Sequence, residues 1–308
     1  TITMKHSLLA LSLSLVSFAS FAQGPIEIGT PLSATNENGI DKPLSSNVKV
    51  FGSFHFAESC VFDPDRNLLL VVNSGVRSGS DLDNDGYISL INPDGSVHTS
   101  KWIGVSRDNL DLVNPLGSAI SNGVLYVVDM TVVRSFDLET GQPINNFEVE
   151  GSTFLNGIAV DDEGTAYISN TRDNGMLFKV TADGESTLLV DGAPLEAPNG
   201  VAIDGDGNVV VVNIGDNGVL TFSPDGELLK TEHSVESGTD GVVVLEDGTK
   251  YVSSVRFGSV SRIAPGEEAE MIASGIPSAA SMCYDSVQHQ LVIPMNPNNA
   301  IAIIELDD

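Results

Sequence analysis

Basic side chains are scarce in this 308-residue chain, which carries 14 Lys and Arg against 42 Asp and Glu and a formal net charge of −28 at pH 7. This charge makes nucleic acid a poor partner, because phosphate binding depends on Lys and Arg. The same negative field attracts cations. Solubility or salt adaptation is an equally good interpretation, since an acidic balance bears on solubility rather than on fold.

Cysteine is almost absent, with only Cys60 and Cys283. Two cysteines are too few for a disulfide framework, and both stand in short apolar segments. We therefore expect two buried, unpaired thiols that pack as small apolar side chains. A disulfide that joins these two distant positions is the alternative.

Long apolar runs are missing except near the N-terminus, where Lys5 and His6 precede an apolar stretch over residues 8–21. That stretch is shorter than the about 20 residues that a membrane-spanning helix needs. A small-x-small cleavage site ends at Ala22, so residues 1–22 are predicted to be a secretory signal peptide. An uncleaved anchor is the alternative. We expect a secreted or periplasmic mature protein without a membrane span.

Several familiar catalytic motifs are also missing. The sequence has no Gly-x-Ser-x-Gly elbow, no His-Glu-x-x-His, no phosphate loop and no Cys/His cluster. Long amphipathic helical patterns are absent too. Short Val/Ile/Leu runs broken by Asp-Gly and Pro-Asp-Gly turns fill the chain instead, which is typical of an all-β protein.

Six segments of the chain start alike, with a small residue, a short apolar strand, an Asp/Gly turn and a second strand. The residues just before the small residue form one column: Glu58, Leu116, Asn156, Asn199, Asp240 and Ala280. From Leu116 onward the spacing in this column is 40 to 43 residues, and the first interval of 58 residues contains insertions near 75–85 and 105–114. This period is that of a four-stranded propeller blade, so we predict a six-bladed β-propeller.

The last repeat supplies only three strands, near residues 282–285, 290–294 and 300–305. Residues 48–54 form a spare strand that we expect to pair as the outer strand of the last blade, which would close the ring and remove its open edges. The propeller domain is then residues 48–308. Residues 23–47, rich in Pro, Asn and Ser, are expected to be an extended lead-in with little structure of its own.

In such a ring we expect the polar members of the column to lie together on one face. In the third repeat we expect strands at residues 158–160, 166–170, 176–180 and 186–190. Successive strands alternate in direction, so the column lies on the same face as the loops that join second and third strands.

Four of the six column positions carry a side-chain oxygen: Glu58, Asn156, Asn199 and Asp240. Two carboxylates and two amides suit a hard divalent cation, most of all Ca²⁺, whereas Zn²⁺ prefers His and Cys. Mg²⁺, Mn²⁺ and Zn²⁺ are the alternatives. Asn-Gly and Asp-Gly are also ordinary turn dipeptides, but their recurrence in register with Glu58 favours a metal site.

Around these positions the sequence resembles a known family. Ala57-Glu58-Ser59, Leu155-Asn156-Gly157, Pro198-Asn199-Gly200 and Thr239-Asp240-Gly241 look like the ring motifs of the senescence-marker-protein/gluconolactonase/luciferin-regenerating-enzyme family. The four-oxygen pattern is also similar to that of the paraoxonases and diisopropylfluorophosphatase. The resemblance implies a six-bladed propeller with one catalytic divalent metal in its central tunnel, and hydrolysis of lactones or related esters.

The resemblance also implies roles for single residues. Glu58, Asn199 and Asp240 match the metal ligands of gluconolactonase-type members, and Asn156 matches a position that binds substrate in those members and metal in the paraoxonase-like ones. Asp240 would act as general base or as nucleophile. The gluconolactonase branch often has Arg two residues before the matching Asn, where this chain has Phe154, so the specificity for sugar lactones is open.

Loops on the same face hold further candidates. Asp81, Asp83 and Asp85 resemble the start of an EF-hand loop and mark a second candidate calcium site. The twelfth position is Asn92 rather than Glu, and a solvated acidic loop is the alternative. Candidate substrate-binding residues are Arg77, Arg172, Arg256 and His233, although surface arginines and a solvated histidine are commoner.

The leading hypothesis is a secreted, metal-dependent hydrolase of the lactonase or esterase type that acts on a small molecule. A non-catalytic propeller that binds a peptide, glycan or small ligand on the same face is the rival. A lyase or phosphotriesterase that uses the same metal is a third candidate. No protein partner is evident.

Overall fold

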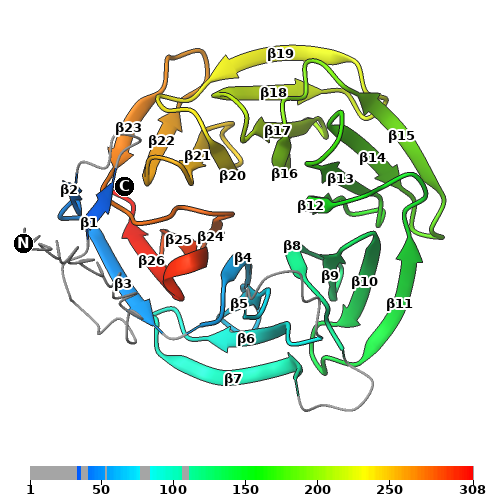
Figure 1. The fold of residues 1–308 in the computed structure, drawn as a ribbon, viewed down its shortest axis with the longest axis horizontal. Helices are drawn as coiled ribbons and strands as arrows, with labels where there is room; N and C mark the ends of the chain where they lie inside the picture. The colour runs from blue at the N-terminus through cyan, green and yellow to red at the C-terminus, as the bar shows by residue number, and fades with distance from the viewer. Residues whose placement is uncertain (1–32, 36–40, 53, 77–83, 106–110, 308) are drawn as a thin grey trace, which may run out of the picture.

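The chain folds into a closed ring of six antiparallel sheets with four strands each (Figure 1). The computed structural model describes residues 33–35, 41–52, 54–76, 84–105 and 111–307. Within these ranges the one helix is a short 3₁₀ turn, η1 (Asn296–Asn298), and no helix there is long and apolar enough to cross a membrane. The predicted all-β, six-bladed propeller is confirmed.

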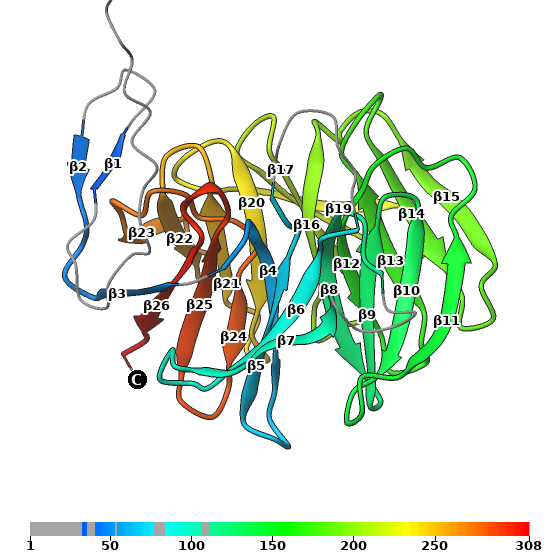
Figure 2. The same ribbon diagram turned by 60° about the horizontal axis from the view of Figure 1, so that its bottom comes forward.

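Each blade runs from an inner strand near the ring axis to an outer strand at the rim (Figures 1 and 2). From inside to outside, blade 1 consists of β4 (Ala57–Asp63), β5 (Leu68–Asn73), β6 (Tyr87–Ile91) and β7 (Val97–Gly104). In the same order, blade 2 consists of β8 (Pro115–Ser121), β9 (Val124–Asp129), β10 (Val132–Asp137) and β11 (Pro143–Glu148). Blade 3 consists of β12 (Leu155–Val160), β13 (Ala166–Asn170), β14 (Met176–Val180) and β15 (Ser186–Asp191). Blade 4 consists of β16 (Pro198–Ile203), β17 (Val209–Asn213), β18 (Gly218–Phe222) and β19 (Leu228–His233). Blade 5 consists of β20 (Thr239–Val244), β21 (Lys250–Ser254), β22 (Ser259–Ile263) and β23 (Glu270–Ala273).

Blade 6 is composite. Its inner strands come from the C-terminal end of the chain: β24 (Cys283–Asp285), β25 (Gln290–Met295) and β26 (Ala300–Glu305). Its outer strand is β3 (Val48–Gly52), which pairs antiparallel with β26 from Ile304 opposite Val48 to Ala300 opposite Gly52. The predicted closure by an N-terminal strand is therefore confirmed.

The segment before β3 contains more structure than expected. β1 (Ser33–Thr35) pairs antiparallel with β2 (Asp41–Pro43), with Ala34 opposite Lys42. This two-stranded ribbon lies outside the ring, next to blade 6 (Figures 1 and 2).

The position of a strand within its blade explains which residues it contains. The second strand of a blade is covered on both faces by its neighbours, so β5 and β17 read as continuous runs of buried residues, Leu-Leu-Leu-Val-Val-Asn and Val-Val-Val-Val-Asn. Outer strands such as β11 and β19 are mostly exposed and polar. The core accordingly divides into six apolar clusters, one between each pair of adjacent blades.

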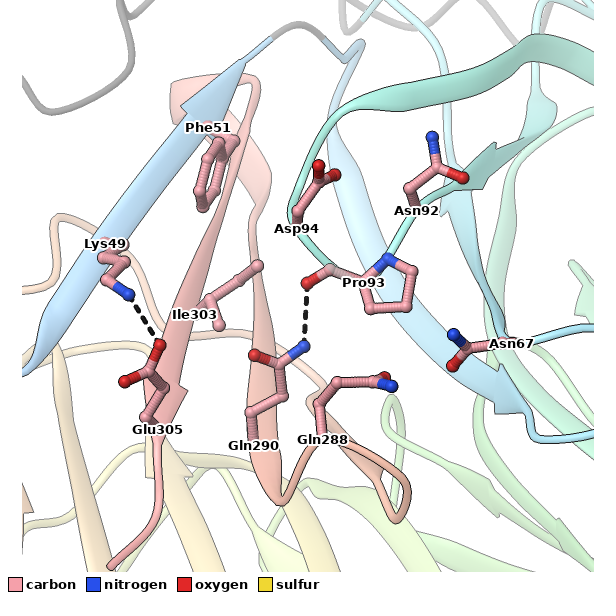
Figure 3. Close-up of a pocket in the computed structure, with 10 residues that line it drawn as sticks. All are labelled: Lys49, Phe51, Asn67, Asn92, Pro93, Asp94, Gln288, Gln290, Ile303 and Glu305. Carbon is pink, nitrogen blue, oxygen red and sulfur yellow. Dashed lines mark hydrogen bonds and ion pairs between the residues drawn. The ribbon is translucent and has the colours of Figure 1, made fainter.

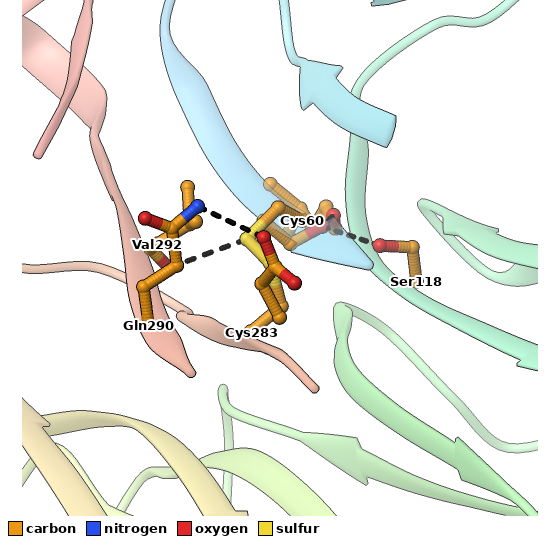
Figure 4. The surroundings of a disulfide bond; sticks show 8 residues. Cys60, Ser118, Cys283, Gln290 and Val292 are labelled. Carbon is orange, nitrogen blue, oxygen red and sulfur yellow. Dashed lines mark hydrogen bonds between the residues drawn. A yellow bond between two sulfur atoms is a disulfide. The ribbon is translucent and has the colours of Figure 1, made fainter. Parts of the chain in front are cut away.

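The two cysteines form a disulfide, with their Cα atoms 5.4 Å apart (Figure 4). The expectation of two unpaired thiols is wrong. Cys60 lies in β4 and Cys283 in β24, which are the inner strands of the first and last blades. Although 223 residues separate them in sequence, ring closure makes these strands neighbours. A residue count alone does not reveal this proximity.

Candidate metal centre

The four polar members of the column occupy the same structural position. Glu58, Asn156, Asn199 and Asp240 are each the second residue of an inner strand: β4, β12, β16 and β20. Leu116 is the second residue of β8, and Ala280 lies just before β24. Because all six inner strands surround the ring axis (Figure 1), the four oxygen-bearing side chains start at one level of one tunnel.

A local irregularity sets the direction of these side chains. In β4, β8, β12, β16 and β20 the pairing with the second strand shifts register at the column residue, between Leu155 and Ile158 for example. Such bulges bend a strand and re-aim a side chain. The side chain of the column residue therefore does not follow the regular alternation of side chains between the two faces of the strand.

Glycine follows four of the six column residues because consecutive blades meet there backbone to backbone. A Cβ at Gly117, Gly157 or Gly200 would lie 2.1, 2.1 and 2.4 Å from the carbonyl oxygen of the next column residue: Asn156, Asn199 and Asp240. No side chain fits in that space. The ring is completed where Ser281 N–H donates to the Glu58 carbonyl, with an N–O distance of 3.2 Å. The column residues are therefore neighbours around the axis.

Buried oxygens without protein partners mark this level of the tunnel. The four side chains are only 2–6 % exposed. Asn199 Oδ1 and Asp240 Oδ1 have no hydrogen-bond partner, although buried polar atoms in folded proteins almost always have one. Burial, together with the nearby Glu58 carboxylate, raises the pKa of Asp240 well above its usual range. Two carboxylates thus face each other in a space that disfavours their charge.

Neighbouring groups hold two of these side chains. Asn156 Nδ2 donates to Thr171 Oγ1 at 2.9 Å, and the Thr171 hydroxyl donates to the Pro198 carbonyl at 2.7 Å. These two hydrogen bonds fix the orientation of the Asn156 amide, with its nitrogen toward Thr171. Asn296 Nδ2 donates to Glu58 Oε2 at 3.1 Å.

The tunnel continues past the column residues as a hollow of about 260 Å³. All six inner strands contribute to its wall, with residues that include Cys60, Phe62, Ser118, Ile158, Val201, Val242 and Cys283. The disulfide thus lies in the tunnel wall, two residues after Glu58 in β4.

A larger hollow, about 680 Å³, lies elsewhere, between blades 6 and 1 (Figure 3). Its lining includes Asn67 and Gln288, from the turns between first and second strands, at the end of the blades opposite Glu58. Gln290 Nε2 donates across it to the Pro93 carbonyl at 2.8 Å, and Lys49 pairs with Glu305 at 2.6 Å. The bond from Gln290 to Pro93 joins the two blades, whereas the ion pair of Lys49 and Glu305 lies within blade 6. None of the predicted site residues that the structure describes lines this hollow.

The rim candidates have different surroundings. The exposed Arg172 guanidinium lies over the Phe154 ring, 3.9 Å from its centroid, and the side chain of Arg256 packs close to Gly238. Each arginine therefore covers the residue two positions before a column residue of its own blade. His233 ends the outer strand β19, is exposed, and bonds Asn217 through Nδ1 at 3.3 Å. It lies at the periphery of the ring, away from the column.

The second candidate calcium site falls largely outside the described residues. Arg77, Asp81 and Asp83 are among the residues that are not described. Asp85 is described, and its Oδ2 accepts the backbone N–H of Val76 at 2.6 Å. This bond accounts for one oxygen of Asp85 within its own loop.

The donor set fits a hard divalent cation. Side-chain oxygens of two carboxylates and two amides gather at one level, and two of these oxygens lack any protein partner. In the described part of the chain, no three side chains of His, Cys, Asp or Glu are grouped to hold a metal. The mixed carboxylate–amide ring therefore remains the candidate there, and its chemistry matches Ca²⁺ better than Zn²⁺.

Sequence reasoning missed two sets of residues around the ring. Asn296 was overlooked because it belongs to no repeating column, although it lies in the loop between second and third strands, a loop type predicted to lie on this face. The other set ends the second strands: Asn73, Asp129, Asn170 and Asn213 accept backbone N–H groups of the segment that leads into the inner strand of the same blade. The repeat of this polar position was the available signal.

Comparison with known proteins gives the fold but no close relative. No family model and no curated protein matches the sequence. Among solved structures, a gluconolactonase from Xanthomonas campestris is similar, with a TM-score of 0.63 and 15% identity over 93% of this chain and 99% of that one. A putative gluconolactonase is similar at a TM-score of 0.63 and 15% identity, over 90% and 97% of the two chains. A streptogramin B lyase has a TM-score of 0.56 and 13% identity, over 85% and 88%. The structural neighbours are thus gluconolactonase and lyase propellers, which agrees with the resemblance seen in the sequence.

Proposed function

We propose that this protein is a metal-dependent hydrolase of the lactonase type, with a divalent cation, Ca²⁺ foremost, held by Glu58, Asn156, Asn199 and Asp240. The observation that carries the proposal is the pair of orphaned buried oxygens, Asn199 Oδ1 and Asp240 Oδ1, in the ring that Glu58 shares. A cation would satisfy both oxygens and neutralise the two carboxylates. The similarity to gluconolactonase structures supports the same activity.

A cation held by these four residues would supply electrostatic stabilisation for the negative charge that develops on a lactone carbonyl oxygen during attack. Asp240 then has two available roles. As a general base, its carboxylate takes a proton from water while the water oxygen attacks the carbonyl carbon, the ring C–O bond breaks, and the leaving alkoxide receives a proton to give the hydroxy acid. As a nucleophile, it forms an acyl-enzyme that water hydrolyses.

Hydrogen bonds and stacking orient one proposed metal ligand, Asn156, and one residue proposed to contact substrate, Arg172. Asn156 is held by Thr171 with its nitrogen engaged, so its oxygen is the group that it offers to the site. Arg172 is stacked on Phe154, two residues before Asn156, where such a stack limits the motion of the guanidinium. We propose that Arg172 and Arg256 attract substrates that carry a carboxylate.

The disulfide supports the proposed export of the protein. Disulfides persist in oxidising compartments and are rare in the cytosol. A secreted or periplasmic location, reached through the predicted signal peptide at residues 1–22, is consistent with the covalent link between Cys60 and Cys283.

The central test is metal analysis of the purified protein, followed by a panel of lactones and aryl esters assayed with and without chelator. We expect activity on lactones that is lost with the metal and restored by Ca²⁺. If the metal-loaded protein is inactive on the whole panel, the hydrolase proposal fails, and the rival of a propeller that only binds a peptide, glycan or small ligand replaces it.

A lyase is the second candidate, because a streptogramin B lyase is among the structural neighbours. Mass spectrometry of the products separates the two reactions: hydrolysis adds one water to the substrate, whereas elimination gives an unsaturated product of unchanged total mass. Elimination without water uptake would favour the lyase.

The rim arginines give a separate, specific expectation. Arg172→Ala and Arg256→Ala should raise KM for a carboxylate-bearing lactone and leave KM for a neutral lactone nearly unchanged, because only the charged substrate loses an ion pair. Steady-state kinetics on a matched pair of substrates measures this. Equal effects on both substrates would show that the arginines maintain structure and do not select charge.

A further inference from the structure

Blade 6 carries no oxygen at its column position, which is Ala280, but it reaches the ring by another route. Asn296 opens η1, in the connection between β25 and β26, and its side chain is buried, with 9 % of the residue exposed. Its Nδ2 donates to Glu58 Oε2 at 3.1 Å. Asn296 therefore contacts a proposed metal ligand of the neighbouring blade directly.

The hydrogen bond to Glu58 also fixes the amide orientation. If the amide were turned over, its oxygen would face a carboxylate oxygen, and two acceptors would meet without a proton. With Nδ2 committed to Glu58, Oδ1 is directed elsewhere, and it is buried without a protein partner. A buried acceptor left unpaired keeps its full desolvation penalty, so the position of Asn296 needs a compensating contact.

The loop that carries Asn296 is anchored to the segment that leads into β4. Phe54 N–H donates to the Asn299 carbonyl at 3.1 Å, and Phe56 N–H donates to Asn299 Oδ1 at 2.9 Å. Ser278 Oγ donates to Asn298 Oδ1 at 3.0 Å. The two bonds from Phe54 and Phe56 hold the loop against the residues just before Glu58, so Asn296 and Glu58 are placed as one unit. The bond from Ser278 ties the loop to the segment that precedes β24.

We propose that Asn296 is a fifth protein ligand of the cation through Oδ1, and that its Nδ2 positions the Glu58 carboxylate for the same ion. This inference rests on the proposed metal site. Ca²⁺ takes six to eight oxygens, so a neutral amide adds a ligand without adding charge and leaves positions for substrate and water. Asn296 thus takes the place of the missing oxygen at Ala280.

The test compares Asn296→Leu and the smaller Asn296→Ser with the wild-type protein and with Asn174→Ala. Asn174 lies in the corresponding loop of blade 3, where its Nδ2 bonds Asp191 at an exposed site, so it is a matched control. Calorimetric titration with Ca²⁺ measures affinity, and thermal melts in chelator check that each variant is folded. We expect both Asn296 variants to bind at least about tenfold more weakly, since losing a ligand or its support typically costs 10- to 100-fold.

A second readout separates ligation from packing. With Eu³⁺ as the probe, luminescence lifetimes in H₂O and D₂O count the waters on the bound ion. Replacing one protein oxygen in an ion shell of fixed size should admit about one additional water, so we expect that increase in both Asn296 variants and no change in Asn174→Ala.

The outcomes are distinguishable. Wild-type affinity and water count in both Asn296 variants would overturn the inference, and weaker binding with an unchanged count would overturn the assignment of Oδ1 as a ligand. If the wild-type protein itself binds neither Ca²⁺ nor Eu³⁺, the proposed metal site fails instead.

Discussion

At the scale of single residues, the ring shows how a protein retains buried polar groups that it does not satisfy internally. Asn199 Oδ1 and Asp240 Oδ1 are buried without partners, whereas Asn156 and Glu58 each have one. An unpaired buried acceptor lowers stability. A cation would supply the missing partner for both oxygens, and this is why we propose a metal site for the ring.

Asp240→Asn tests the chemistry at this scale. The amide keeps an oxygen for the cation but is a poor base and a poor nucleophile. We expect turnover of lactones to fall by about 10²- to 10³-fold, the usual effect of removing one electrostatic contributor. The variant should still bind Ca²⁺.

The fold of this variant is checked in chelator. There, Asp240→Asn should melt no lower than the wild-type protein, because a neutral amide replaces a buried carboxylate beside Glu58. Full activity of Asp240→Asn in a folded protein would remove Asp240 from the reaction.

At the scale of elements, four inner strands, β8, β12, β16 and β20, each combine a bulge at the start of the strand with a glycine that has no room for a Cβ. Gly157 lies so close to the Asn199 carbonyl that a Cβ would be 2.1 Å from it, and its N–H donates to Ser169 Oγ at 2.8 Å. The Ser169 hydroxyl in turn donates to the same carbonyl at 2.5 Å. Each inner strand is therefore fixed by the next blade as much as by its own.

Gly157→Ala should accordingly destabilise the protein and distort the site together. Forcing an extra methyl into a packed position costs about 1–3 kcal/mol, and more where backbone must move. Gly205→Ala is the control, because its Cβ would meet only the Glu246 carbonyl, at 3.7 Å. Urea denaturation with a parallel Ca²⁺ titration measures both effects, and equal stability of the two variants would contradict the close-approach argument.

Another element-scale feature depends on pH. Glu232 in β19 is bonded by Lys250 Nζ at 2.9 Å and Lys230 Nζ at 3.1 Å. Burial by itself raises the pKa of Glu232, but the hydrogen bonds and charges of the two lysines outweigh it and lower the pKa below its usual value. The folded state therefore binds fewer protons than the unfolded one near this pKa, so the contribution to stability is present above the pKa of an unfolded glutamate and is lost as the pH falls.

Glu232→Gln should therefore lower the free energy of unfolding at pH 7, by on the order of 1 kcal/mol because solvent screens part of the pair. The difference from the wild-type protein should shrink toward zero as the pH approaches 3. Glu305→Gln, which breaks the exposed pair with Lys49, is the control and should have almost no effect. A deficit of Glu232→Gln that persists at low pH would assign it to packing.

Sequence periodicity predicted the elements well where each one repeats. In the third blade the expected second and third strands, at residues 166–170 and 176–180, coincide with β13 and β14, because turn residues bound them on both sides. The inner strand was predicted to start at residue 158, whereas β12 starts at Leu155. Its first residues lie at the bulge, where the apolar alternation that marks a strand is interrupted.

At the scale of the whole molecule, the ring is closed twice, by β3 on β26 at the rim and by the Cys60–Cys283 disulfide at the tunnel wall. The first closure was predictable because the last repeat lacks a strand. The second was named only as the alternative to two buried thiols, because the two cysteines stand in apolar segments that suit either state and become neighbours only when the ring closes. Asn296 was missed for the same reason: its partner Glu58 is near it only in the closed ring.

The disulfide should contribute strongly to stability. A cross-link that closes a loop of 223 residues restricts the unfolded chain, and losing a native disulfide typically costs about 2–5 kcal/mol. We expect Cys60→Ala with Cys283→Ala, or reduction of the wild-type protein, to lower the free energy of unfolding by that amount, and the urea midpoint with it, while the six-bladed fold persists through β3. If reduction leaves the midpoint unchanged, closure at the rim alone holds the ring.

The composite sixth blade has a consequence for how the protein is made. β3 precedes every strand of the other five blades along the chain, whereas the strand that it pairs with, β26, follows all of them. During synthesis Glu58 therefore exists for most of the time without Asn296 and without its neighbours across the axis. The proposed cation site can assemble only after β26 has been made and the ring has closed on β3, so metal uptake would report that closure.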